Sequence, residues 1–179
     1  MTSTRILFLI TRLDDLGGAQ VHVRAMATAL AADGHQVSVA GGGAPEAMTG
    51  LASSGVELVI FKHLVHPIRL VADVRALWEM RALIKAHRPD LLAFHSSKVG
   101  VLGRLAAMGL GIPVIFTAHG WAFTDGVSRF KRIFYSQIER VCARLSARII
   151  TVSEYDRQLA VKSGIAPVEK LITVRNGMP

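Results

Sequence analysis

Short apolar runs alternate with segments of helical periodicity from one end of the chain to the other. Apolar runs of this length, bounded by glycine, proline or charged residues, are typical of strands buried on both faces of a parallel sheet. The helical segments supply the crossovers that parallel strands need. Strands are expected at residues 5–10, 36–40, 57–61, 91–94, 114–117, 148–152 and 171–174. Helices are expected at residues 19–32, 45–54, 67–87, 99–108, 128–146 and 153–163. This alternation predicts an α/β fold with a doubly wound parallel sheet.

Length and composition limit the class of protein. The chain has 179 residues, of which 51% are hydrophobic, so we expect one domain with a full core and exclude intrinsic disorder. No apolar run reaches the roughly 18 residues of a membrane span, and the N-terminal ILFLI run is too short for a signal peptide. The single cysteine, Cys142, cannot form an internal disulfide, which agrees with a reducing compartment. These features predict a cytoplasmic protein.

The net charge of +8 indicates an anionic partner, which could be a nucleic acid, an acidic membrane surface or a phosphorylated ligand. Nucleic acid is disfavoured, because the basic residues are dispersed and no RRM, KH or zinc-finger signature occurs. Arg129, Lys131, Arg132 and Arg140 lie on the helix expected at 128–146. A solvated face is the usual explanation for such charges. The functional alternative is that they face an anionic membrane, to which the protein would bind peripherally.

The segment 112–124, IPVIFTAHGWAFT, is the strongest candidate for the active site. It combines a buried strand with a polar loop, and ligands of open α/β sheets bind just beyond the carboxyl ends of the strands. His119 is the candidate catalytic residue, although a histidine at this position can also be purely structural. Gly120 allows close approach of a ligand, and Trp121 and Phe123 could form the walls of a pocket.

Three other loops lie at the same expected edge of the sheet. Gly17 and Gly18 enter a helix whose free N–H groups favour phosphate, although neither GxGxxG nor GxxxxGK[ST] is present. His95, Ser96, Ser97 and Lys98 could bind a hydroxylated or anionic ligand, or the serines could cap the next helix. Ser153 and Glu154 are explained equally well by capping. No metal site is predicted, because the histidines are scattered without HxxxH or paired-carboxylate spacing.

With these motifs in order, the chain resembles the N-terminal half of a GT-B, family-4-type glycosyltransferase. The resemblance covers essentially the whole chain, and its HGWAF version is similar to the bacterial exopolysaccharide and lipid-linked-sugar branch. The segments that carry it are LGGAQVHV (Leu16–Val23), HSSKVGVLGR (His95–Arg104), TAHGWAF (Thr117–Phe123), VSEYDR (Val152–Arg157) and VRNGMP (Val174–Pro179).

The resemblance implies two Rossmann-like domains that face a cleft. Residues 1–174 would form the acceptor-side domain and 175–179 the start of the interdomain linker, whereas the nucleotide-sugar domain is absent from this chain. Gly17 and Gly18 would contact the diphosphate of a UDP- or GDP-linked sugar, and His119 would approach the transferred sugar. The candidate acceptor-binding residues are Gln20, His22, His95, Ser96, Ser97, Lys98, Gly120, Trp121, Phe123, Ser153 and Glu154.

The resemblance also implies the reaction. Transfer would retain the anomeric configuration without a divalent metal or cofactor, and the acceptor would be a saccharide or a polyprenyl-linked sugar. The isolated chain would be inactive, because half of the donor site lies in the other domain. Two alternatives stay open: a nucleotide- or anion-binding module, which the missing glycine fingerprint disfavours, and a non-catalytic membrane-docking domain, which the positive charge favours.

Overall fold

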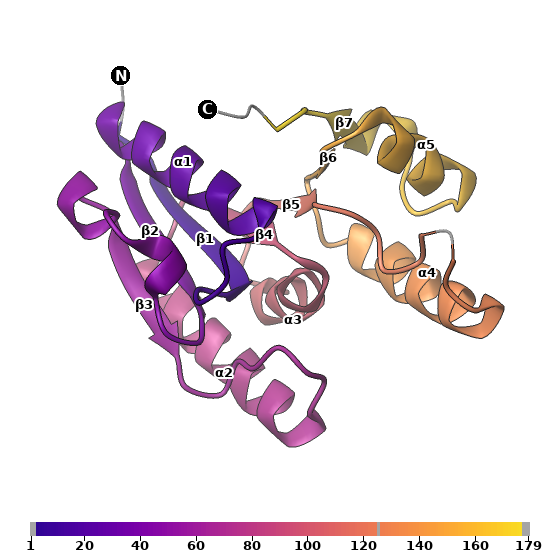
Figure 1. The fold of residues 1–179 in the computed structure, drawn as a ribbon, viewed down its shortest axis with the longest axis horizontal. Helices are drawn as coiled ribbons and strands as arrows, with labels where there is room; N and C mark the ends of the chain where they lie inside the picture. The colour runs from indigo at the N-terminus through magenta and orange to yellow at the C-terminus, as the bar shows by residue number, and fades with distance from the viewer. Residues whose placement is uncertain (1–2, 125, 177–179) are drawn as a thin grey trace.

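The computed structural model describes residues 3–124 and 126–176 and contains one parallel sheet of seven strands (Figure 1). The strands are β1 (Arg5–Arg12), β2 (Gln36–Gly42), β3 (Glu57–Phe61), β4 (Leu91–His95), β5 (Val114–Ala118), β6 (Arg148–Thr151) and β7 (Leu171–Thr173). Their order in the sheet is β3-β2-β1-β4-β5-β6-β7, and all neighbouring pairs are parallel. The predicted doubly wound parallel sheet is confirmed. The expected linker at 175–179 lies mostly outside the described residues.

Within the described residues, five α-helices and three short 3-10 helices connect the strands. The α-helices are α1 (Gly18–Ala32), α2 (Leu70–His87), α3 (Ser97–Ala107), α4 (Arg129–Ala143) and α5 (Glu154–Lys162), and the 3-10 helices are η1 (Glu46–Met48), η2 (Ala52–Ser54) and η3 (Val168–Lys170). The single helix expected at 45–54 is wrong. Gly50, with φ +86°, interrupts the segment between η1 and η2, because that conformation cannot continue a right-handed helix. α2 begins three residues later than expected.

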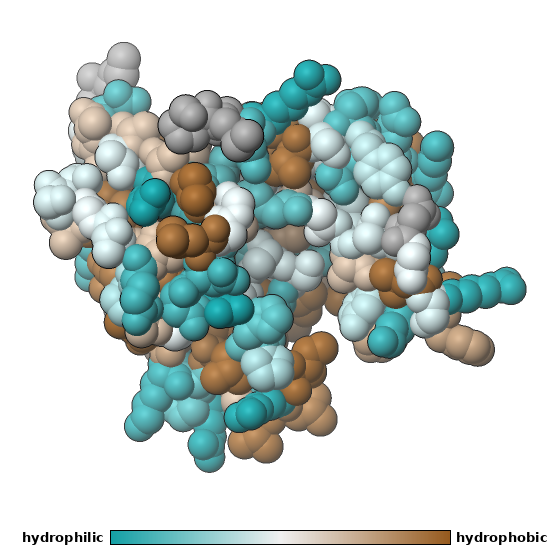
Figure 2. Space-filling view, in the orientation of Figure 1, coloured by the Kyte–Doolittle hydropathy of each residue, from teal (hydrophilic) through white to brown (hydrophobic). Residues whose placement is uncertain are grey.

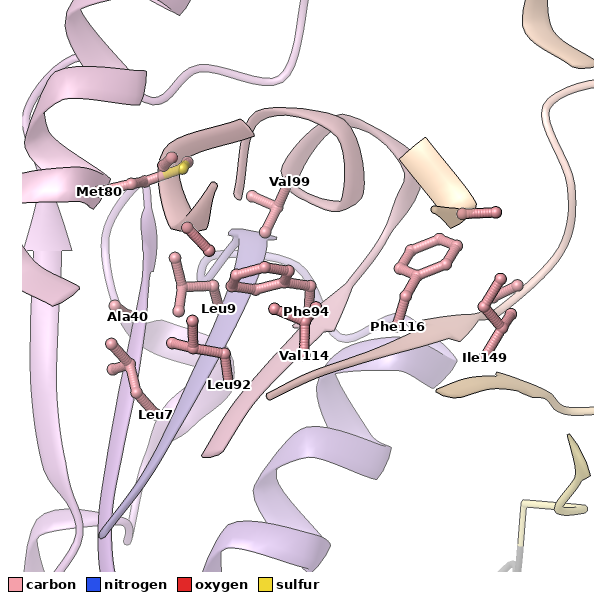
Figure 3. Close-up of a cluster of buried hydrophobic side chains, with 14 of the residues drawn as sticks. Leu7, Leu9, Ala40, Met80, Leu92, Phe94, Val99, Val114, Phe116 and Ile149 are labelled. Atoms are coloured by element: carbon pink, nitrogen blue, oxygen red, sulfur yellow. The ribbon is translucent and has the colours of Figure 1, made fainter. Parts of the chain in front are cut away.

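The sheet separates two hydrophobic layers, and the alternation of side chains along β1 shows this most clearly. Leu7 and Leu9 point to the layer formed with α2 to α5, whereas Ile6, Phe8 and Ile10 point to the layer formed with α1, η1 and η2. Figure 3 shows the first layer. Because the chain reverses direction after β3, β1 and β4 are neighbours at the centre of the sheet, and a crevice is expected at their carboxyl ends.

Helix α3 packs unusually close to the sheet, because two of its residues are glycines. A Cβ at Gly100 would enter the ring of Phe116, and a Cβ at Gly103 would lie 3.0 Å from the ring of Phe94. Arg104, fully buried, stacks on Phe116 and forms a 2.7 Å ion pair with Glu139 of α4. α3 is therefore fixed to both the sheet and α4, and its N-terminus at Ser97 directly follows β4, at the edge where the strands end.

Candidate active site

A cavity of about 370 Å³ lies at the carboxyl ends of β4 and β5. Its position follows from the topology, because the ends of the central strands and the N-terminus of α3 meet there. It contains five of the residues predicted from the sequence and four that were not predicted. The lining residues are Thr11, His66, Ser96, Ser97, Lys98, Phe116, Ala118, His119 and Gly120.

Ser96 is the strained residue of the cavity. Its φ of 72° is uncommon for a residue with a side chain. Thr11 at the end of β1 stabilises this conformation: its backbone N–H donates to Ser96 Oγ at 3.2 Å, and the two hydroxyl oxygens are 2.6 Å apart. Thr11 also accepts a hydrogen bond from the backbone N–H of Val99 in α3. Strain that is held in this way is typical of functional sites. The sequence analysis missed Thr11, although the register of β1 beside β4 could have indicated it.

Three histidines form a cluster at one wall of this site. Nδ1 of His95 and Nε2 of His119 are 3.0 Å apart, so one ring donates a hydrogen bond and the other accepts it. The ring of His22, from α1, lies 5.3 Å from that of His119 and 5.7 Å from that of His95. Phe8 stacks on His95 at 5.6 Å and closes the cluster from the sheet side. The fold thus brings together three histidines that lie far apart in the sequence and that were each predicted as site residues.

All three histidines are neutral at physiological pH. Burial lowers the pKa of His119 to about 4, helped by the nearby His22. Burial also lowers the pKa of His22, and it places the pKa of His95 well below its ordinary value, with His119 and His22 adding to the effect. A neutral imidazole can accept or donate a hydrogen bond, but it has no imidazolium proton to give. His119 is therefore suited to orient a hydroxyl group and unsuited to act as a general acid near pH 7.

Lys98 lines the cavity but is mainly structural. Its ammonium donates 2.7 Å hydrogen bonds to the carbonyls of Val65 and Pro67, and it forms a 2.5 Å ion pair with Asp73. These contacts attach the loop before α2 to the N-terminus of α3. They also place His66, which the sequence analysis did not single out, against the cavity. Because its charge is compensated within the chain, Lys98 is a weaker candidate for direct ligand binding than predicted.

The glycine-rich entry to α1 retains the features of an anion site. Gly17 is the N-cap residue and no side chain caps the helix, so the first N–H groups stay available. A side chain at Gly18 would meet nothing within 4 Å, which shows that the helix start faces open space. Gln20 is buried instead, and its amide donates to the carbonyl of Arg12 at 3.3 Å. Gln20 therefore supports the loop.

Trp121 and Phe123 do not form the walls of the cavity, contrary to the sequence analysis. They are 4% and 0% exposed and stack on each other at 5.1 Å between the ring centroids. The indole N–H of Trp121 donates to the carbonyl of Asp156 in α5 at 2.9 Å. Both aromatic side chains turn into the hydrophobic core, because burying rings of this size stabilises the fold more than a loop surface would.

Ser153 and Glu154 are explained by helix capping. Ser153 Oγ accepts a hydrogen bond from the backbone N–H of Asp156 at 3.0 Å, which caps α5. Glu154 accepts hydrogen bonds from Thr173 and Arg157. Neither residue is among those that line the cavity.

The predicted membrane-facing residues divide into two groups. Arg129 and Lys131 lie in the exposed first turn of α4, as does Arg132. Arg140 instead donates to the carbonyls of Ser163 and Gly164, which attaches α4 to the end of α5.

Within residues 3–124 and 126–176, no cluster of His, Cys, Asp or Glu side chains has the geometry of a metal site. No helix among these residues has both the length and the hydropathy needed to cross a membrane.

Comparison with known proteins decides the family. The glycosyl transferase 4-like domain family matches residues 17–177, which is nearly the whole chain. The chain belongs to this family. A curated relative from Escherichia coli, named UDP-Gal:alpha-D-GlcNAc-diphosphoundecaprenol alpha-1,3-galactosyltransferase, is 29% identical over 132 residues. The match covers 73% of this chain and 34% of the relative, so the chain spans about a third of that protein.

Solved structures of other proteins, a glycosyltransferase among them, have the same fold. Anabaena HepE, solved in complex with UDP and glucose, matches with a TM-score of 0.72 at 19% identity, over 98% of this chain and 45% of HepE. A glycosyltransferase from Rickettsia africae matches with a TM-score of 0.75 at 14% identity, over 99% of this chain and 44% of that protein. The chain is thus a Rossmann-like domain of the GT-B type, as the sequence motifs indicated.

Proposed function

We propose that this chain is the acceptor-side domain of a retaining glycosyltransferase. It would transfer a sugar from a nucleotide-sugar to a saccharide or a lipid-linked acceptor in bacterial polysaccharide synthesis, without a divalent metal. The observation that carries the proposal is the neutral His95–His119 pair, whose His119 lines the cavity and lies beside His22 of α1, the helix with the uncapped start. The family and the E. coli relative, whose name includes a lipid-linked acceptor, support the reaction class.

In this proposal His119 orients the transferred sugar. Its Nε2 is engaged by His95, so Nδ1 is the atom left to bond a sugar hydroxyl. Because His119 is neutral, it cannot balance the charge that develops on the departing diphosphate. That charge would be stabilised by the N–H groups at Gly17 and Gly18 and by cations of the second domain. The hydroxyl groups of Ser96 and Ser97, which also line the cavity, would bind the acceptor.

The donor is proposed to be a UDP-sugar. The UDP complexes of HepE and the name of the E. coli relative, which specifies UDP-galactose, favour UDP over GDP. The second domain is proposed because the chain spans less than half of each of these proteins. We therefore expect no transfer by the 179-residue chain alone.

The test is transfer from a panel of UDP- and GDP-sugars to polyprenyl-diphosphate-linked acceptors. The protein is the reading frame that encodes this chain, extended to its stop codon. The His119→Ala variant should lose activity while its circular dichroism spectrum is unchanged. The matched control is His87→Ala, because His87 is hydrogen-bonded to Glu57 and does not line the cavity, and it should retain activity.

Two further readouts test the finer points. The anomeric configuration of the product, measured by NMR, should match that of the donor, and EDTA should leave the rate unchanged. Full activity in His119→Ala would remove this residue from the mechanism. No transfer with any donor in the panel would favour the non-catalytic binding module.

A further inference from the structure

Large apolar side chains are exposed at the starts of two helices. Phe130, at the start of α4, is 88% exposed, and Leu70, the first residue of α2, is 79% exposed. Other apolar residues near them in each helix are exposed as well. Figure 2 shows apolar surface gathered over the α2 region. We define the apolar rim as Ile68, Leu70, Val71, Val74 and Trp78 at α2, and Phe130, Ile133 and Phe134 at α4. The apolar rim therefore has two parts, one on each side of α3, and exposed apolar side chains gathered in this way indicate an interaction site.

The apolar rim lies on the two helices that flank α3, the helix whose N-terminus lines the cavity. α2 and α4 each contact α3, so α3 lies between them on the same face of the sheet. The N-terminus of α3 supplies Ser97 and Lys98 to the cavity, and Lys98 holds the loop that leads into α2. Gly120, which also lines the cavity, begins the loop that connects β5 to α4. A partner seated on the apolar rim would therefore lie next to the mouth of the cavity.

The exposed charge around the apolar rim is positive. Every carboxylate of α2 and α4 is paired within the chain: Asp73 with Lys98, Glu79 with His63, and Glu139 with Arg104. The charged side chains that these helix starts present to solvent are basic. They include Arg69 and Arg75 at α2, and Arg129 and Lys131 at α4. Apolar residues interspersed with basic ones match an anionic lipid surface, which offers both acyl chains and negative head groups.

We infer that the apolar rim is the surface by which this domain docks on an anionic phospholipid bilayer, with the cavity mouth turned toward the lipid. A second copy of the chain fits less well, because it would bring two basic surfaces together on a chain of net charge +8. Only the role of this docking rests on the proposed function: a lipid-linked acceptor would reach the cavity from the bilayer. The binding itself requires neither donor nor transfer.

Vesicle binding by this chain tests the inference directly. The chain should sediment with vesicles of phosphatidylcholine and phosphatidylglycerol and not with phosphatidylcholine alone. Trp78 is 63% exposed in the apolar rim, whereas Trp121 is 4% exposed in the core. Brominated lipid should therefore quench the tryptophan fluorescence of the bound chain, and the Trp78→Phe substitution should abolish that quenching.

Two triple variants locate the surface. Leu70→Gln/Val71→Gln/Val74→Gln and Phe130→Gln/Ile133→Gln/Phe134→Gln should each weaken vesicle binding about tenfold or more. The matched control is Met26→Gln/Val161→Gln/Val168→Gln, which removes exposed apolar side chains outside the apolar rim and should bind as the parent does. Circular dichroism and the melting temperature check that each variant is folded.

A charge variant separates lipid binding from general adhesion of apolar surface. Arg129→Gln/Lys131→Gln should weaken binding to anionic vesicles by about tenfold or more, and added salt should reduce the binding of the parent chain. Absence of binding to anionic vesicles, or unchanged binding by both rim variants, would overturn the inference. Self-association that both rim variants abolish, without vesicle binding, would assign the surface to a second copy. An inactive but vesicle-binding protein would contradict the proposed function and leave this inference standing.

Discussion

The centre and the flanks of the sheet's carboxyl edge differ in how their side chains are satisfied. At the centre, His95, His119, Ser96 and Thr11 are held by one another and are shielded by the strand ends. At the flanks, Phe130 and the start of α2 present apolar groups to solvent. A pre-organised polar centre suits a small hydroxylated ligand, whereas an exposed apolar flank suits an extended partner. The proposed chemistry and the inferred docking surface thus lie at separate parts of one edge.

The largest effect on stability is expected from breaking the buried ion pair that joins α3 to α4. Arg104→Ala leaves Glu139 buried without its partner, and we expect the free energy of unfolding to fall by about 3–5 kcal/mol. Urea denaturation measures this. The double variant Arg104→Met/Glu139→Leu, which removes both charges, should recover most of the lost stability. A loss below about 1 kcal/mol in Arg104→Ala would show that the pair contributes no more than a surface ion pair.

The pH dependence of stability should report on the centre of the edge, where the three histidines are buried. The pKa values of His22, His95 and His119 are lowered on folding, so the unfolded chain binds more protons. Stability is therefore complete above about pH 6.5 and falls as the pH decreases toward about 4, with a slope of up to about 1.4 kcal/mol per pH unit for each histidine. Urea denaturation across this range measures the slope, which should be smaller in His119→Phe. An identical slope in that variant would exclude His119 as a source.

The close packing of α3 should tolerate no additional methyl group. Gly100→Ala drives a Cβ into the Phe116 ring, and we expect a loss of about 1–3 kcal/mol because α3 must move away from the sheet. The matched control is Gly18→Ala, where a Cβ meets nothing within 4 Å. Thermal unfolding compares the two variants, and equal melting temperatures would contradict this description of the helix–sheet contact.

The smallest effect is expected from a serine that caps a helix outside the cavity. Ser153→Ala removes the cap of α5 and should cost about 1 kcal/mol of stability. Because Ser153 does not line the cavity, the transfer rate of the extended protein should be unchanged. A reduced rate at full folding would return Ser153 to the list of acceptor-binding residues.

The fold could be predicted because its signals are local. Buried strands in a parallel sheet are short apolar runs, whereas the close approach of α3 to the sheet through Gly100 and Gly103 was not predicted. The helix expected at 45–54 was wrong because Gly50 has a positive φ, which interrupts the segment although its other residues are compatible with a helix. Boundaries such as the start of α2 depend on Lys98, which is distant in sequence.

The site could be predicted only in part, because some of its features depend on contacts between residues that are distant in sequence. His119, His95 and Ser96 were found because they directly follow or end buried strands, where topology places ligands. Whether a side chain then turns toward the cavity or into the core depends on packing between distant segments. Trp121 therefore pairs with Asp156, Lys98 holds the loop before α2, and Thr11 and His66 enter the cavity without a sequence motif.

The most direct test of the division between centre and flanks compares two acceptors in one transfer assay. The extended protein and its variants are supplied either with a short-chain, water-soluble acceptor or with a long polyprenyl acceptor embedded in anionic vesicles. His119→Ala should lose transfer to both, whereas Phe130→Gln/Ile133→Gln/Phe134→Gln should lose transfer only to the embedded acceptor. Equal loss of both reactions in the rim variant, with its fold intact, would contradict the separation of chemistry from docking.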